Sequence, residues 1–233
     1  MGAKTALLAY ADGDIATALR GAAAGDREEA EALVRRVHPG HLVDGVADEC
    51  LWDAVYPPDD VTYVVALPGV DLLCDRRLAF DPPSALPARL VEAGARRRIV
   101  LHGMHSVSDW LGFAVWEDGV LVRSLNVGQG GVGEDIGEPF PFELPYWAGE
   151  HPVPGWDRLP FHPLELGEAA LRALFGFVME GHNRPDDVDA DAVRLHGFRV
   201  TDPTGRERAA RDELYAMARR MVLHRCGQDS AER

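Results

Sequence analysis

The chain has 233 residues, a hydrophobic fraction of 46% and a formal net charge of −14. This length and apolar content suffice to bury a substantial core, which excludes a disordered chain. The negative charge would repel nucleic acid and anionic membranes, so the composition disfavours both as partners and favours a basic one.

The cysteines and the apolar runs bear on the cellular setting. Cys50, Cys74 and Cys226 are widely separated and odd in number, which fits neither a disulfide framework nor a zinc site and favours a reducing compartment. The apolar run at residues 6–9 is too short for a signal peptide, and no run approaches the ~18 residues of a membrane span. We therefore expect a cytoplasmic protein without a membrane anchor.

The first third of the chain predicts strands and short helices. Asp26 with Glu29 three residues later is a capping box, which precedes apolar residues at helical spacing up to Val37. Ser84 is a possible N-cap for a further helix. The predicted strands are 4–10, one within 41–56, 61–67 and 70–74, and the predicted helices are 15–24, one after Asp26, and about 86–95.

Residues 98–127 predict an antiparallel meander of three apolar-rich strands. Asp118-Gly119 occupies the two-residue position that favours a type I′ turn. This turn pairs Trp116 with Leu121, Ala114 with Arg123 and Gly112 with Leu125. Residues 128–163 then alternate prolines and glycines with aromatic side chains, and we interpret them as a long, well-packed loop over the sheet.

The last third predicts a helix that starts at Pro163 and ends at Gly181, followed by a strand over 193–200. A final helix at about 207–226 is rich in arginine. It either docks on the acidic body or forms an arm that binds a partner or nucleic acid. Together the elements predict a single α+β domain over 1–233, with a mainly antiparallel sheet of about five to seven strands, helices packed on one face and the aromatic loop on part of the other.

Three motifs suggest chemistry. His102, His105 and Asp109 would form a metal or acid–base site of a metal-assisted hydrolase if a bulge brought them together, although residues three apart on a strand point to opposite faces. Asp12-Gly13-Asp14 resembles a phosphotransferase motif, but that motif needs a distal lysine and the single lysine precedes it, so Asp14 as a helix N-cap is the simpler explanation. The run at 128–133 matches G-x-G-x-x-G but lacks the helix that dinucleotide binding needs, which favours a mobile glycine loop.

A resemblance to a known family rests on four segments: MGAKTALLAYADGD, HGMHSVSDWLGFAVWEDGVLVRSL, EDIGEPFPFELPYWAGEHPV and PFHPLELGEAALRALFGFVMEG. Together they resemble an uncharacterised family of actinobacterial cytoplasmic proteins, a domain of unknown function. The resemblance implies a common fold and brings no activity. The strand, Asp-Gly hairpin and acidic loop are more loosely similar to small α+β immunity proteins that neutralise toxins.

The leading functional hypothesis is a non-catalytic protein-binding protein, immunity- or regulator-like, that uses no metal and no cofactor. Acidic groups beside exposed aromatic rings would bind a basic protein partner. The hydrolase is the alternative, and the sequence leaves the oligomeric state open. The candidate binding residues are Arg123, Glu134, Asp135, Glu138, Glu143, Tyr146 and Trp147.

Overall fold

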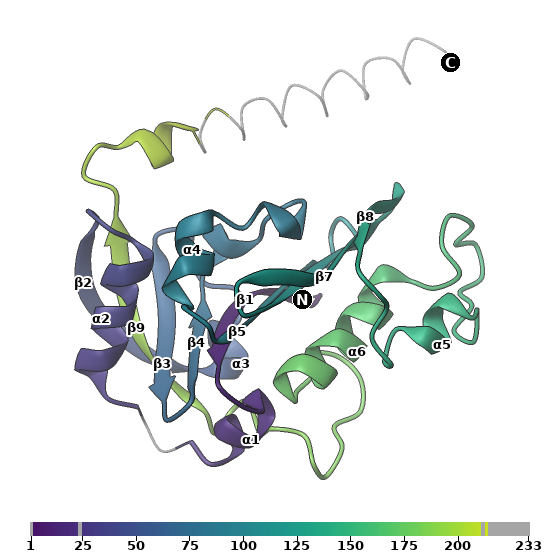
Figure 1. The fold of residues 1–233 in the computed structure, drawn as a ribbon, viewed down its shortest axis with the longest axis horizontal. Coiled ribbons are helices and arrows are strands. Elements are labelled where there is room, and N and C mark those ends of the chain that lie inside the picture. The colour runs from purple at the N-terminus through teal and green to yellow at the C-terminus, as the bar shows by residue number, and fades with distance from the viewer. Residues whose placement is uncertain (1, 23–24, 211–212, 214–233) are drawn as a thin grey trace.

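The computed structural model describes residues 2–22, 25–210 and 213. Within them, nine strands form one sheet in the order β2-β9-β3-β4-β1-β5-β6-β7-β8, and all neighbouring pairs are antiparallel (Figure 1). The first strand thus lies at the centre, and β2 and β8 are the edges. The strands are β1 (Lys4–Ala11), β2 (Leu42–Cys50), β3 (Val61–Leu67), β4 (Val70–Cys74), β5 (Arg98–His105), β6 (Trp110–Glu117), β7 (Val120–Gly128), β8 (Gly131–Ile136) and β9 (Arg194–Thr201).

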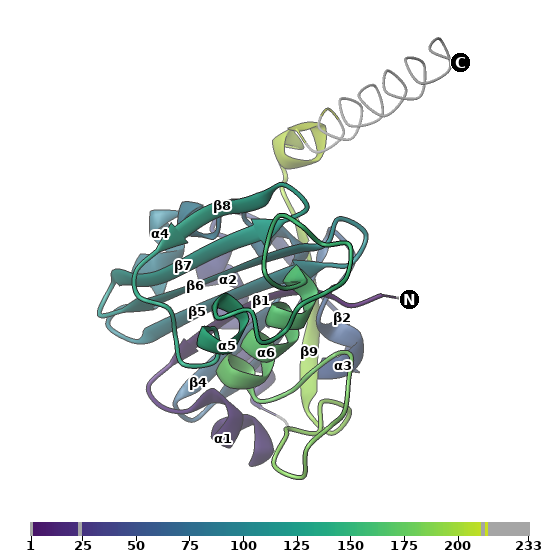
Figure 2. The ribbon, with the colours of Figure 1, turned by 90° about the vertical axis from the view of Figure 1, so that its right-hand side faces the viewer.

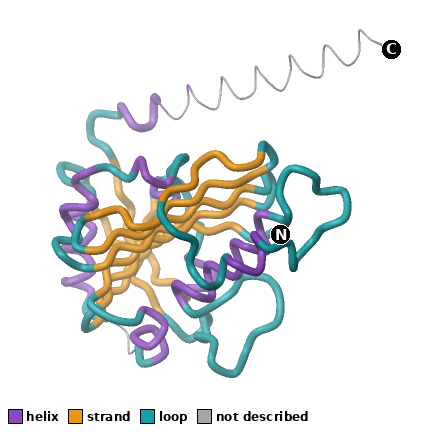
Figure 3. Tube along the Cα trace, turned by 45° about the vertical axis from the view of Figure 1, so that its right-hand side comes forward, coloured by secondary structure: helices purple, strands orange, loops and turns teal. Residues whose placement is uncertain are grey.

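Helices cover both faces of this sheet (Figures 1 and 3). One face, here the α6 face, packs against α1 (Ile15–Arg20), α3 (Leu51–Ala54), α5 (Leu144–Trp147) and α6 (Pro163–Phe175). The opposite face, here the α2 face, packs against α2 (Arg27–Val37) and α4 (Ala88–Ala93). Two short 3₁₀ turns, η1 (Arg76–Leu78) and η2 (Pro83–Ala85), connect β4 to α4. Figure 2 shows α5 and α6 in front of the sheet.

The predicted α+β class with a mainly antiparallel sheet is confirmed. The sheet has nine strands rather than the predicted five to seven, and the prediction that helices pack on one face only is wrong. In β1, Leu7 and Ala9 pack into the α6-face core, whereas Leu8 and Tyr10 pack into the α2-face core. Because a strand alternates its side chains, an all-apolar central strand needs cover on both faces. The two cores together provide that cover.

Local sequence signals explain the ends of several helices. Asp14 accepts a hydrogen bond from Thr17 N at 2.7 Å, and Asp26 accepts from Glu28 N at 2.7 Å, so both are N-caps. Asp14 thus has the N-cap role, and the structure adds nothing in favour of the phosphotransferase interpretation. Ser84 lies in η2 and does not cap α4. Helix α6 begins at Pro163 as predicted and ends at Phe175, before the predicted end at Gly181, with Gly176 (φ 85°) as its C-cap.

The hairpin between β6 and β7 has the predicted turn but a shifted register. Positive φ angles at Asp118 (51°) and Gly119 (79°) fit a type I′ turn, and Trp116 pairs with Leu121. Beyond that pair Val122 is a bulge, so Arg123 pairs with Val115 rather than Ala114. The predicted pairs Ala114–Arg123 and Gly112–Leu125 are therefore wrong. Most of the predicted helix at 207–226 lies outside the described residues.

Candidate functional site

The structure separates the residues of the predicted hydrolase site. His102 lies on the α6 face of β5 and is buried, whereas His105 lies on the α2 face beside Tyr56. The Asp109 carboxylate accepts from Gln129 Nε2 at 2.9 Å and lies 3.6 Å from His162 Nε2. Among the described residues, no group of three His, Cys, Asp or Glu side chains could hold a metal ion. Within the described part of the chain, His102, His105 and Asp109 therefore do not form the one site that the hydrolase alternative requires, in keeping with the alternation of side chains along a strand.

His102 has a structural role between the sheet and α6. Its Nε2 lies 3.1 Å from the Gly167 carbonyl oxygen, and its Nδ1 lies 2.9 Å from Thr5 Oγ1. A carbonyl oxygen only accepts, so Nε2 carries the proton and the Thr5 hydroxyl donates to Nδ1. Thr5 Oγ1 in turn accepts from Met104 N at 3.1 Å. Burial lowers the pKa of His102 to about 4, so the ring is neutral at pH 7.

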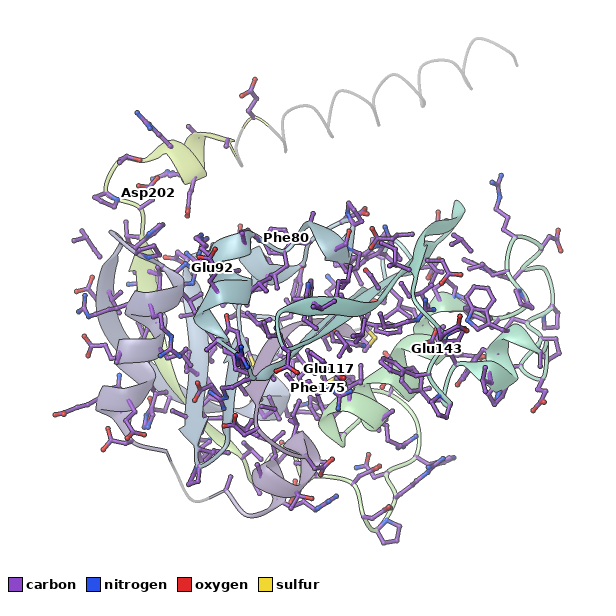
Figure 4. All side chains as sticks on the ribbon, in the orientation of Figure 1. Phe80, Glu92, Glu117, Glu143, Phe175 and Asp202 are labelled. Atoms are coloured by element: carbon purple, nitrogen blue, oxygen red, sulfur yellow. The ribbon has the colours of Figure 1, made fainter. Side chains whose placement is uncertain are left out.

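Two of the predicted binding residues form a buried ion pair instead. Arg123 Nε and Nη2 donate to Glu143 Oε1 and Oε2 at 2.9 and 2.6 Å, and both side chains are fully buried. Arg123 Nη1 also donates to Asp135 Oδ1 at 2.5 Å. Glu143 Oε1 accepts from Phe140 N at 2.8 Å, which fixes the loop before α5. Figure 4 shows Glu143 between the sheet and α5. The prediction that Arg123 and Glu143 contact a partner is wrong, because neither reaches the surface.

The other predicted binding residues differ in exposure. Asp135 keeps a side-chain exposure of 46%, and Glu138 is exposed. Glu134 is half-buried and accepts hydrogen bonds from the Ser84 and Ser124 hydroxyls. Tyr146 and Trp147 are half-buried, and their rings contact Phe161 edge-on with centroids 5.7 and 5.0 Å away. Only part of the predicted surface is therefore open to a partner.

Three large apolar side chains lie exposed in this part of the chain. Val132 and Ile136 belong to the edge strand β8 and are 48% and 40% exposed, and Leu144 at the start of α5 is 54% exposed. With Asp135 and Glu138 they define what we call the β8–α5 surface. Within the described residues β8 pairs with β7 alone, so its outer backbone edge carries no strand.

A cavity of about 740 Å³ opens where β5 ends and β6 begins, on the α2 face. Its lining includes the rings of Tyr56, His105 and Trp110, and the glycine loop at 128–133. Trp110 Nε1 donates to Asn126 Oδ1 at 2.8 Å, and Asn126 Nδ2 donates to Asp81 Oδ1 at 2.5 Å. The glycine loop is the turn between β7 and β8, so a strand follows it in place of the helix that dinucleotide binding needs.

The sequence reasoning did not select Trp110, Asn126 or Asp81, although one signal pointed to Trp110. Gly103 and Gly112 interrupt two apolar strands and face each other across β5 and β6. A Cβ atom on either would lie within 3.0 Å of the Trp110 ring, at 2.9 and 2.6 Å respectively. Glycine within a strand often marks such a close approach, and here it marks where the six-membered ring of the indole approaches the two strands.

Comparison with known proteins places the chain in a family. It belongs to a family of unknown function, DUF6928, whose family model matches residues 5–198. This confirms the expectation of an uncharacterised domain family. The chain has no significant match among curated proteins or solved structures. In the described part of the chain no helix has both the length and the hydropathy to cross a membrane.

Proposed function

We propose that this protein is a non-catalytic binding protein, immunity- or regulator-like, that docks a basic protein partner on the β8–α5 surface. The observation that carries the proposal is the exposure of Val132 and Ile136 on the free edge strand β8, of Leu144 at the start of α5, and of the carboxylates of Asp135 and Glu138 in the same stretch of chain. Exposed apolar side chains rimmed by polar ones are typical of protein interaction sites.

The chemistry of this surface suits a strand or loop with positive charge. The free edge of β8 offers backbone N–H and C=O groups to an added strand. The apolar side chains would supply most of the affinity, while Asp135 and Glu138 would speed encounter with a cationic partner. The formal net charge of −14 adds a long-range attraction for the same cationic partner.

The buried pair of Arg123 and Glu143 supports this proposal because it holds the surrounding elements in place. Arg123 lies on β7, Asp135 on β8 and Glu143 before α5, so one guanidinium ties together the elements that present the surface. A surface that is ordered before binding loses less conformational entropy when the partner arrives. We infer that the protein works in the cytoplasm, because Cys50 and Cys74 are free thiols.

Site-specific photocrosslinking in cells of the native host tests the proposal. A photoreactive residue at Leu144 should trap a partner with a basic isoelectric point, whereas one at Val120, which is 65% exposed on the β6–β7 turn, should not. The same adduct at both positions, or an acidic partner at Leu144, would overturn the proposal.

Variants of the trapped complex then separate affinity from encounter rate. Leu144→Asp should mainly speed dissociation, because it removes apolar contact. Glu138→Arg should mainly slow association, and this effect should weaken at high salt. Val120→Asp is the matched control and should change neither rate. Unchanged rates for Leu144→Asp would contradict the assignment of the surface.

A further inference from the structure

The cavity on the α2 face has one rigid aromatic wall. The Trp110 indole lies across Gly103 and Gly112, and its Nε1 donates to Asn126 Oδ1 at 2.8 Å. Asn126 is only 8% exposed, so its amide is fixed by its surroundings. A planar ring held on a sheet and anchored by a buried amide is a ready platform for stacking another planar ring.

Asp81, one of the lining residues, is a hydrogen-bond acceptor. Asp81 Oδ1 accepts from Asn126 Nδ2 at 2.5 Å, and no described residue donates to its second oxygen, Oδ2. The residue is exposed where it lines the cavity. A ligand that places an amino group here would meet a carboxylate with a free lone pair, and hydrogen bonds to charged groups are among the stronger ones.

Two basic side chains, which do not themselves line the cavity, lie beside the ring of Tyr56, which does. The Arg76 guanidinium lies 4.3 Å from the centroid of the Tyr56 ring, and Lys4 Nζ lies 5.8 Å from it. The ring of His105 is 5.9 Å from that of Tyr56. Burial lowers the pKa of His105, and the charges of Lys4 and Arg76 lower it further. Arg76 is paired with Asp59 at 3.0 Å, whereas no described carboxylate forms an ion pair with Lys4.

We propose that this cavity binds a planar, amino-bearing heterocycle with an anionic substituent, which is the chemistry of a purine mononucleotide. The heterocycle stacks on Trp110, its amino group donates to Asp81, and the anionic group lies toward Lys4. The volume of about 740 Å³ is within the range of small-molecule sites. This site is distinct from the β8–α5 surface, and either proposal can fail while the other holds.

The test uses the full-length protein and three probes: adenosine 5′-monophosphate, adenosine, which lacks the anion, and purine riboside 5′-monophosphate, which lacks the amino group. Calorimetry should show that removing either group weakens binding about tenfold or more. Lys4 is the single lysine of the chain, so selective ¹⁵N-lysine labelling gives one amide signal. Adenosine 5′-monophosphate should shift it, and adenosine should shift it less.

Variants assign each preference to its residue. Lys4→Gln should remove the preference for the monophosphate over adenosine, and Lys4→Arg should keep it. Asp81→Asn should remove the preference for the amino group, while Asp118→Asn, on the distant β6–β7 turn, should leave it unchanged. The proposal is overturned if none of the probes binds at millimolar concentration, if monophosphate and nucleoside bind equally, or if Lys4→Gln and Asp81→Asn bind as the wild type does.

Discussion

Arg123 Nη2 lies 2.6 Å from Glu143 Oε2, and both side chains are fully excluded from solvent. The pair joins β7 to the loop before α5, and Asp135 adds a second carboxylate from β8. A buried charge is costly unless it is paired, so each partner here depends on the other. This relationship ties the segment before α5 to the sheet, since Glu143 also accepts from Phe140 N.

Removing one partner should destabilise the fold strongly. Glu143→Gln removes the buried carboxylate charge and leaves Asp135 as the carboxylate partner of Arg123, and we expect a loss of about 3–5 kcal/mol in the free energy of unfolding. Urea denaturation measures it. The control is Glu31→Gln in the exposed pair of Arg35 and Glu31, where a loss of about 0.5 kcal/mol or less is expected.

A double variant checks the origin of that loss. Arg123→Met combined with Glu143→Leu replaces the charges with apolar groups, so it should cost much less than the sum of the two single substitutions. Additive losses would show that the two side chains do not act as a pair.

The sequence predicted the elements with strong local signals and missed those that depend on distant partners. Asp26 was predictable because an N-cap contacts the next residues, and the turn at Asp118-Gly119 because its φ angles restrict the choice of residue. Strand β8 was not predictable, since its sequence GVGEDI shows neither an alternation of apolar and polar residues nor an enrichment in β-branched residues. Its pairing with β7 determines its conformation.

The site residues show the same division. Ala114, the predicted partner of Arg123, packs into the α2-face core, but the bulge at Val122 pairs Arg123 with Val115 and places it on the α6 face, where Glu143 lies. No local pattern predicts that bulge. In the sequence, Arg123 and Glu143 therefore looked like exposed charges, although they form a buried pair. Asn126 and Asp81 are 45 residues apart in the chain and meet only after the sheet forms.

His102 should make the protein sensitive to mild acid. The pKa of His102 is lowered to about 4 in the fold, against about 6.5 in an unfolded chain, so the unfolded state binds a proton first as the pH falls. The stability contributed by the neutral ring is therefore complete above pH 6.5 and is lost as the pH falls toward 4. The loss should be on the order of 3 kcal/mol.

Denaturation at a series of pH values measures this slope. His102→Gln should flatten the profile between pH 6.5 and 4, whatever its effect at pH 7. His182→Gln changes an exposed histidine and should keep the wild-type slope. An NMR titration in which His102 protonates near pH 6.5 would contradict the assigned role.

Gly112 should be intolerant of any side chain because the Trp110 ring occupies its space. A Cβ atom there would lie 2.6 Å from Trp110 Cζ2 and 2.9 Å from Pro83 Cγ. Gly112→Ala should therefore lift the indole, weaken the bond from Nε1 to Asn126 and cost about 1–3 kcal/mol. Gly13→Ala, where no atom lies within 4 Å of the added Cβ, should stay within about 0.5 kcal/mol of the wild type.

A double-variant cycle identifies the clash as the cause. In a Trp110→Ala background the indole is gone, so Gly112→Ala should cost clearly less than it does in the wild type. The indole N–H signal of Trp110 should also shift in Gly112→Ala, because its hydrogen bond to Asn126 lengthens. The contrary result is an equal cost of Gly112→Ala in both backgrounds and an unchanged indole signal. It would show that the two facing glycines do not determine the position of the Trp110 ring.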